Sequence, residues 1–97
     1  MTNKYPEDLM IHRNDPGNMN LVSQSISMPD GHAGTRVTYY AALHQVIIED
    51  TCYRADRPAE LYVKRIDIPV ELTEKSEILQ YACQKSFALS MLLQSPF

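Results

Sequence analysis

The side chains that could bind a metal are three histidines and two cysteines, and their spacing forms no known zinc motif. His12, His32 and His44 lie too far apart for two of them to stand three or four residues apart on one helix. Cys52 and Cys83 form no C-x-x-C pair. A long-range site that joins a histidine with a cysteine stays open. The pattern favours no metal, no cofactor and two reduced thiols.

The sequence contains no motif typical of acid–base or nucleophilic catalysis either. The seven serines include no G-x-S-x-G elbow, so a Ser or Cys would have to meet His12 or His44 through the fold. Adjacent acidic residues occur at positions 7–8 and 49–50, but neighbouring side chains point apart on helices and on strands. We therefore expect a protein that is not an enzyme.

A segment rich in basic and aromatic residues could contact nucleic acid. Tyr53 and Tyr62 are interleaved there with four cationic residues: Arg54, Arg57, Lys64 and Arg65. Single-strand binders stack bases on aromatic rings and contact phosphates with cations. Four acidic residues in the same stretch cancel most of this charge: Asp50, Asp56, Glu60 and Asp67. A small nucleic-acid-binding regulator that uses this hairpin is the alternative interpretation.

The acidic residues form the more informative set. Seven of them are our candidate partner-binding residues: Glu7, Asp8, Asp15, Asp30, Glu71, Glu74 and Glu77. Helix neighbours three residues apart lie about 5–6 Å from each other, and alternate strand residues lie about 6.5–7 Å apart. Both spacings resemble that of successive phosphates, so such rows could imitate a nucleic-acid backbone. Acids at a helix start could instead only offset the helix dipole and keep the protein soluble.

The composition predicts one folded domain over residues 1–97. Hydrophobic residues make up 44% and charged residues 22%, which is typical of a globular protein. Twelve acidic and nine basic residues give a net charge of −3, which argues against direct binding of nucleic acid. No apolar run approaches the roughly 20 residues that span a membrane. The polar first ten residues show no signal peptide, so we expect an intracellular protein without membrane contact.

Short elements should position the N-terminal and central residues. Pro6 followed by two acids predicts a short helix near the N-terminus, with a strand over residues 9–13 as the rival interpretation. Alternating apolar and polar side chains predict strands over residues 20–28 and 60–68. Pro and Gly residues predict a loop over residues 29–34.

Two further segments are predicted to be helical. Residues 36–45 place apolar groups at intervals of three and four, which favours a helix that could run on to residue 50. The β-branched residues in this segment are equally compatible with a strand, which remains the alternative interpretation. No Gly or Pro interrupts residues 74–94, so one long helix is expected there, capped by Thr73 and closed by Pro96. The predicted fold class is α+β, a small antiparallel sheet packed against a long C-terminal helix, with a shorter helix or helical turn near the N-terminus.

From MTNKYPEDLMIHRNDPGN at its start to CQKSFALSMLLQSPF at its end, the chain resembles small phage- or prophage-encoded anti-CRISPR proteins that act on type I-F systems. The resemblance lies in size, acidity and general composition over the full length. It implies a non-enzymatic inhibitor that binds the multi-subunit, RNA-guided surveillance complex (Cascade/Csy) in the cytoplasm of the infected bacterial host. Some members imitate DNA with acidic side chains and occupy the basic channel that grips the target duplex.

The expected function is therefore inhibition by binding. We expect a monomer to dock on the basic DNA-binding surface of the CRISPR complex and to block target DNA, without direct contact to nucleic acid. Desolvated Tyr, Met and Leu side chains would supply affinity, and the carboxylates would steer and orient the complex.

Overall fold

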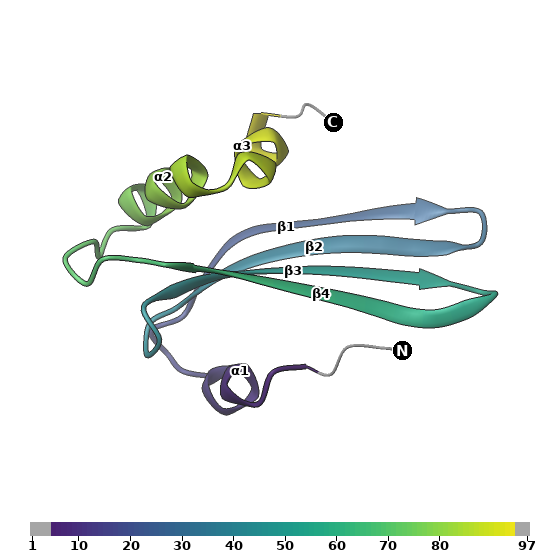
Figure 1. Cartoon of the computed structure of the whole chain (residues 1–97), viewed down its shortest axis with the longest axis horizontal. Helices are drawn as coiled ribbons and strands as arrows, with labels where there is room; N and C mark the ends of the chain where they lie inside the picture. The colour runs from purple at the N-terminus through teal and green to yellow at the C-terminus, as the bar shows by residue number, and fades with distance from the viewer. Residues whose placement is uncertain (1–4, 95–97) are drawn as a thin grey trace.

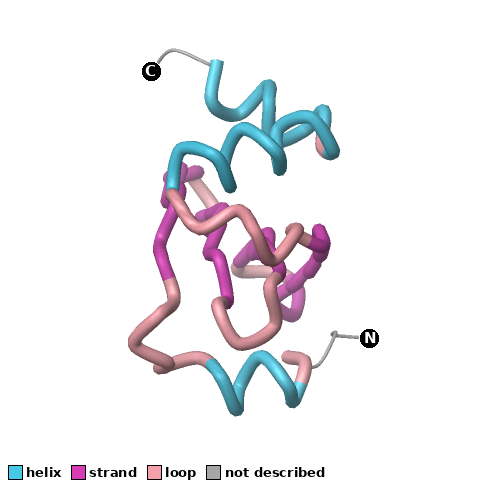
Figure 2. The backbone as a smooth tube through the Cα atoms, turned by 90° about the vertical axis from the view of Figure 1, so that its left-hand side faces the viewer, coloured by secondary structure: helices cyan, strands magenta, loops and turns pink. Residues whose placement is uncertain are grey.

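The computed structural model describes the backbone of residues 5–94 and the side chains of residues 5–92, and within this range the chain forms one four-stranded sheet and three helices. The elements follow in the order α1 (Glu7–His12), β1 (Met19–Met28), β2 (Gly31–Tyr40), β3 (Gln45–Arg54), β4 (Arg57–Asp67), α2 (Lys75–Lys85) and α3 (Phe87–Gln94). Each strand pairs antiparallel with the next, so the sheet order is β1-β2-β3-β4. Figures 1 and 2 show α2 and α3 on one face of the sheet and α1 on the other.

The predicted helix over residues 36–45 is wrong, because this segment and its continuation to residue 50 form the second half of β2, the turn after it and the first six residues of β3. Val37 pairs with Ile48 in the sheet, and both are buried under α2 and α3. Ile47 points to the other face and is buried under α1. A strand that is covered on both faces loses the alternation of apolar and polar residues. Its apolar side chains therefore matched helical spacing by coincidence.

The connection between β1 and β2 is much shorter than the loop predicted over residues 29–34. Only two residues separate the strands, and Gly31 already begins β2. A Cβ atom on Gly31 would lie 1.8 Å from the Tyr53 carbonyl oxygen of β3, so only glycine permits this close approach. The Ala55 N–H donates to the carbonyl oxygen of Asp30 at 2.8 Å and joins the two hairpin turns.

The predictions for the outer strands and the N-terminal helix are confirmed. β1 covers the predicted residues 20–28, and β4 covers residues 60–67 and begins three residues earlier than expected. Pro6 precedes α1, and the two acids lie in its first turn. The rival strand over residues 9–13 is not formed.

The predicted long C-terminal helix is also wrong, because the chain breaks at Ser86 into helices of 11 and 8 residues. Ser86 is extended (φ −135°, ψ 110°), and only 1% of it is exposed. Its N–H donates to the Ala82 carbonyl oxygen at 3.0 Å, and its hydroxyl oxygen accepts from the Leu89 N–H at 3.2 Å. Ser86 therefore ends α2 and caps α3, as serine often does at a helix start.

The boundaries of this region differ from the prediction as well. Glu74, not Thr73, is the N-cap of α2, and it makes no side-chain capping hydrogen bond. Pro96, the expected terminator, lies outside the described residues. The predicted architecture is thus corrected: the sheet dominates the fold, and the helices are short segments that cover part of each face.

Two hydrophobic clusters hold these layers together. The smaller one joins α1 to the sheet through Leu9, Tyr40 and Ile47. The larger one lies under α2 and α3 and contains Val37, Tyr39, Val46, Ile48, Ile66, Ile68, Ile78, Ala82 and Leu89. Complete burial of one such aliphatic side chain contributes about 1.5–3 kcal/mol to folding. Each helix is therefore fixed to the sheet by only a few apolar anchors.

The far halves of both hairpins extend beyond the helices. In Figure 1 the turn between β1 and β2 and the turn between β3 and β4 lie together, at the end opposite to α1 and the start of α2. We call residues 28–31 and 54–57 the hairpin end. Near it, Ile26, Tyr53 and Tyr62 are 61%, 48% and 57% exposed. This part of the sheet is open to solvent on both faces.

Candidate functional site: an acidic end of the sheet

Three of the seven predicted partner-binding acids have ion-pair partners within the chain: Asp8, Asp15 and Asp30. Asp15 Oδ2 is 2.9 Å from His12 Nδ1, just after α1. Asp30 lies at the hairpin end, where Arg54 Nη1 donates to its Oδ2 at 3.3 Å. Asp30 thus lies at the end of the sheet opposite to α1, and neither Asp15 nor Asp30 is counted in the surface described below.

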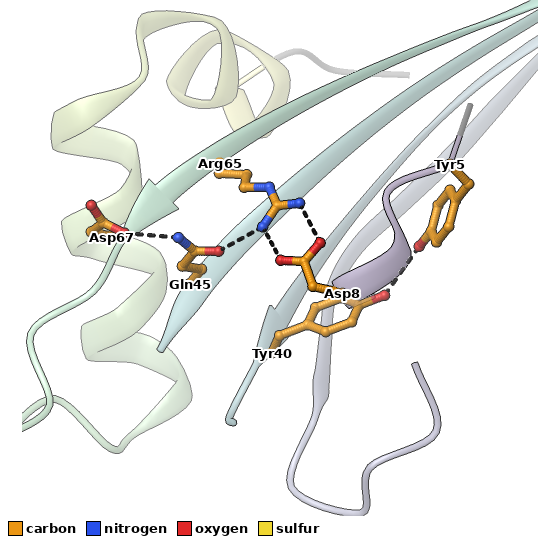
Figure 3. Close-up of polar contacts among 6 residues, drawn as sticks. All are labelled: Tyr5, Asp8, Tyr40, Gln45, Arg65 and Asp67. Atoms are coloured by element: carbon orange, nitrogen blue, oxygen red, sulfur yellow. Dashed lines mark hydrogen bonds and ion pairs between the residues drawn. The ribbon is translucent and has the colours of Figure 1, made fainter. Parts of the chain in front are cut away.

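Asp8 begins a polar network that joins α1 to β4. The Arg65 guanidinium donates two hydrogen bonds to the Asp8 carboxylate, at 2.6 and 2.7 Å. These bonds lower the pKa of Asp8 from 3.8 to about 2. Arg65 also donates to the Gln45 side chain at 3.4 Å, and Gln45 Nε2 donates to Asp67 at 2.9 Å. Figure 3 shows this chain of contacts, which brings Asp67 into the same surface as α1.

Three further acids follow Asp67 around the start of α2. Glu71, Glu74 and Glu77 are exposed, and among the described residues none of them has an ion-pair partner. Glu74 precedes α2 and Glu77 lies in its first turn, so their charges are favourably placed at the positive end of the helix. Glu74 and Glu77 thus lie at a helix start as predicted, whereas Glu71 lies in the loop before it.

Six acids together form what we call the acidic end: Glu7, Asp8, Asp67, Glu71, Glu74 and Glu77. Figure 1 shows α1, the loop before α2 and the start of α2 at the end of the sheet opposite to the hairpin turns. Together with Arg65, which pairs with Asp8, and Lys75, the first residue of α2, these six carboxylates carry a formal charge of −4. The whole chain carries −3, so all other residues together carry +1. Because α1 and α2 lie on opposite faces, the negative charge wraps around the end of the sheet.

Exposed apolar side chains accompany this charge on both faces. Met10 and Ile11 follow the acids of α1 and are 58% and 73% exposed. Val70 precedes Glu71 in the loop before α2 and is 66% exposed. Apolar groups next to charged groups are typical of protein-binding surfaces, because apolar burial supplies affinity and charge supplies orientation.

The rival basic hairpin is largely neutralised in the fold. Arg54 pairs with Asp30 and Arg65 pairs with Asp8. Arg57 Nε lies 3.4 Å from Asp56 Oδ1. Lys64 alone of the four predicted cations has no ion-pair partner in the described part of the chain. This arrangement weakens the interpretation as a nucleic-acid-binding regulator.

Comparisons with known proteins identify no relative of this chain. No protein family, no curated protein and no solved structure matches this chain.

The described residues show few other arrangements that could bind a metal or catalyse a reaction. Residues 5–94 contain no group of three His, Cys, Asp or Glu side chains that could hold a metal ion. His12 is bonded to Asp15 and His44 to the Tyr39 hydroxyl, so neither is set against a serine or cysteine. In the same range no helix is long and apolar enough to cross a membrane.

A polar recess that the sequence analysis did not predict lies on the face of the sheet that α1 covers. The recess measures about 540 Å³, and its lining includes Arg13, Arg36 and Glu49. Glu49 is only 7% exposed, and the Tyr5 side chain forms a hydrogen bond with it. The hydroxyl groups of Tyr5 and Tyr40 lie 3.2 Å apart (Figure 3). Burial, followed by these two hydrogen bonds, raises the pKa of Tyr5.

The register explains why this recess was missed. Glu49 ends a run of three buried apolar residues in β3, and its burial depends on a tyrosine 44 positions earlier in the chain. The recess holds the carboxylate of Glu49 together with two guanidinium groups, so its charges are mixed. We assign it a structural role in fixing the segment before α1.

Proposed function

We propose that this protein is a non-enzymatic inhibitor whose acidic end docks on the basic DNA-binding surface of a type I-F CRISPR surveillance complex. Bound there, it would exclude target DNA, in the cytoplasm of the infected bacterial host. The observation that carries the proposal is the separation of charge: −4 at the acidic end against +1 over the rest of the chain. The resemblance to anti-CRISPR proteins supplies the class of partner.

The free carboxylates would make the main polar contacts. Glu71, Glu74 and Glu77 can each accept hydrogen bonds from lysine or arginine without breaking an ion pair in the described part of the chain. Charge-assisted hydrogen bonds of this kind are stronger than neutral ones. Asp8 is held by Arg65, so it would contribute to the field of the surface more than to direct contacts.

The exposed apolar groups would supply the buried centre of the interface. Met10, Ile11 and Val70 lie beside the acids, and covering them would remove apolar area from water. The negative field would speed the encounter with a basic channel and make association sensitive to salt. Negative charge and exposed apolar area thus lie together, as an inhibitor that competes with DNA requires.

A competition experiment tests this proposal. The purified surveillance complex is incubated with labelled target duplex, and the protein is titrated until half of the duplex is displaced. The variant Glu71→Lys/Glu74→Lys should raise that concentration at least about tenfold, since tenfold corresponds to about 1.4 kcal/mol and one charge-assisted hydrogen bond contributes about 1.5–3 kcal/mol. The concentration of this variant that displaces half of the duplex should also depend less on the salt concentration.

The matched control reverses two acids at the hairpin end. Asp30→Lys/Asp56→Lys changes the net charge by the same amount but leaves the acidic end intact. Because these carboxylates are exposed and paired internally, inhibition should stay within about twofold of the unmodified protein. Equal losses for the two double variants would reduce the effect to net charge and remove the docking site from the account. The unmodified protein should not retard bare DNA or RNA in a gel.

A further inference from the structure

The two edges of the sheet differ in how they meet solvent. β4 contains five charged residues and Pro58 among its 11 residues, and these features protect an edge strand from pairing with another strand. β1 contains no charged residue and no proline in ten residues. Its irregular pairing is confined to the region between Asn20 and Val22, so residues 22–28 form a regular edge.

The backbone groups on the open side of β1 can be assigned. The carbonyl oxygen of Gln24 lies 3.3 Å from where a Cβ on Gly34 would sit, so it points inward to β2. Because backbone groups alternate in direction along a strand, the N–H and C=O groups of the neighbouring serines point outward. These residues are Ser23, Ser25 and Ser27, and all three are exposed. Within residues 5–94, β1 has a strand neighbour on its β2 side only.

We propose that the free protein forms a two-fold symmetric dimer in which residues 22–28 of β1 pair antiparallel with the same residues of a second copy. The two four-stranded sheets would become one continuous sheet. Ser25 is the centre of the regular segment, so the symmetry axis passes beside it. Ser25 then faces Ser25 of the second copy, and Ser23 faces Ser27 of the second copy. The outward groups of three serine pairs supply six backbone hydrogen bonds, two for each pair.

A second copy fits this edge better than an unrelated strand for two reasons. In a symmetric antiparallel pair each residue meets a residue of the same strand, and β1 contains no charge that could be repelled by its own copy. The register also places apolar side chains together, since Val22 faces Met28 of the second copy on the face that carries α2 and α3. Ile26, which is 61% exposed in one chain, faces Gln24 of the second copy.

The assembly would close as a dimer and not continue as a fibre. The only other edge of the described sheet is β4, whose charges and proline oppose pairing. A two-fold contact that uses β1 of both copies leaves no open β1 edge. The regular segment of β1 runs toward the hairpin end, whereas the acidic end lies at the opposite end of the sheet (Figure 1). This inference is therefore independent of the proposed function.

Light scattering after size-exclusion chromatography tests the dimer over a wide dilution series. The unmodified protein should show twice the mass of one chain at high concentration and dissociate on dilution. Ser25→Lys places two lysines opposite each other and should weaken dimerisation at least about tenfold, because like charges directly opposite on paired strands are destabilising. An equimolar mixture of Ser25→Lys and Ser25→Glu should restore a dimer of one copy of each.

Ser76→Lys is the matched control, because it adds the same charge at an exposed position of α2 away from the edge. It should dimerise like the unmodified protein, and circular dichroism should show that every variant is folded. A mass of one chain at all concentrations would overturn the inference. So would a dimer that Ser25→Lys leaves unchanged, or open-ended polymers of the unmodified protein. If Ser25→Lys fails to fold, Ser23→Lys/Ser27→Lys makes the same test, because each new lysine then faces a lysine of the second copy.

Discussion

The two ends of the sheet differ in how far their charged residues form ion pairs with one another. At the hairpin end, Asp30 pairs with Arg54 and Asp56 pairs with Arg57, so positive and negative charges cancel locally. At the acidic end, six carboxylates stand against two cations, and none of the four glutamates there has an ion-pair partner in the described structure. Net charge alone hides this difference, because the chain as a whole carries only −3. The comparison indicates that free carboxylates, and not the total number of acids, mark the candidate docking surface.

The largest expected effect comes from removing the anchor that holds α1 at the acidic end. Leu9 is fully buried between α1 and the sheet. Leu9→Ala should lower the free energy of unfolding by about 2–5 kcal/mol, the usual cost of such a truncation in a core. Denaturant unfolding measures the change. Met10→Ala is the control, because Met10 is 58% exposed, and it should change stability by less than about 0.5 kcal/mol.

A smaller effect should appear as a pH dependence at the acidic end. Arg65 lowers the pKa of Asp8 from 3.8 to about 2 in the folded protein, so the unfolded chain binds this proton first as the pH falls. The stabilisation by the Asp8–Arg65 pair is therefore present above pH 3.8 and is lost as the pH falls toward 2. Asp8→Asn should flatten the free energy of unfolding across this window, and it should cost less than Leu9→Ala because the pair is exposed.

Asp56→Asn makes the same test at the hairpin end. Arg57 also lowers the pKa of Asp56, but through a single contact of 3.4 Å between adjacent exposed residues. We expect a smaller change in the pH profile than for Asp8→Asn. An equal change at both ends would show that the network of Asp8, Arg65 and Gln45 contributes nothing beyond an ordinary surface pair.

Local patterns in the sequence predicted the elements that have one covered face. The alternation in β1 and the acids after Pro6 each reflect a segment with one more buried and one more exposed side. β4 was predicted as well, although Ile66 and Val63 pack on opposite faces of the sheet. β2 and β3 are covered on both faces, so the spacing of Val37 and Ile47 could not distinguish helix from strand. The break at Ser86 has no Gly or Pro signal, because a buried serine cap replaces them.

The candidate site, like the fold, could be predicted from the sequence only in part. Glu71, Glu74 and Glu77 are neighbours in sequence, so their grouping followed from spacing alone. The pairing of Asp8 with Arg65 spans 57 positions and depends on the docking of α1 against β4. The fold also places Asp30 at the hairpin end, and it brings Asp67 next to α1 through Gln45 and Arg65. Which acids stay free is a property of the fold.

Hydrogen exchange with mass spectrometry, on the protein free and bound to the surveillance complex, tests the central claim most directly. The account predicts slower exchange on binding in residues 5–12 and 66–80, which carry the acidic end, and little change in the turns at residues 28–31 and 54–57. Protection of those two turns, with unchanged exchange over residues 66–80, would contradict it.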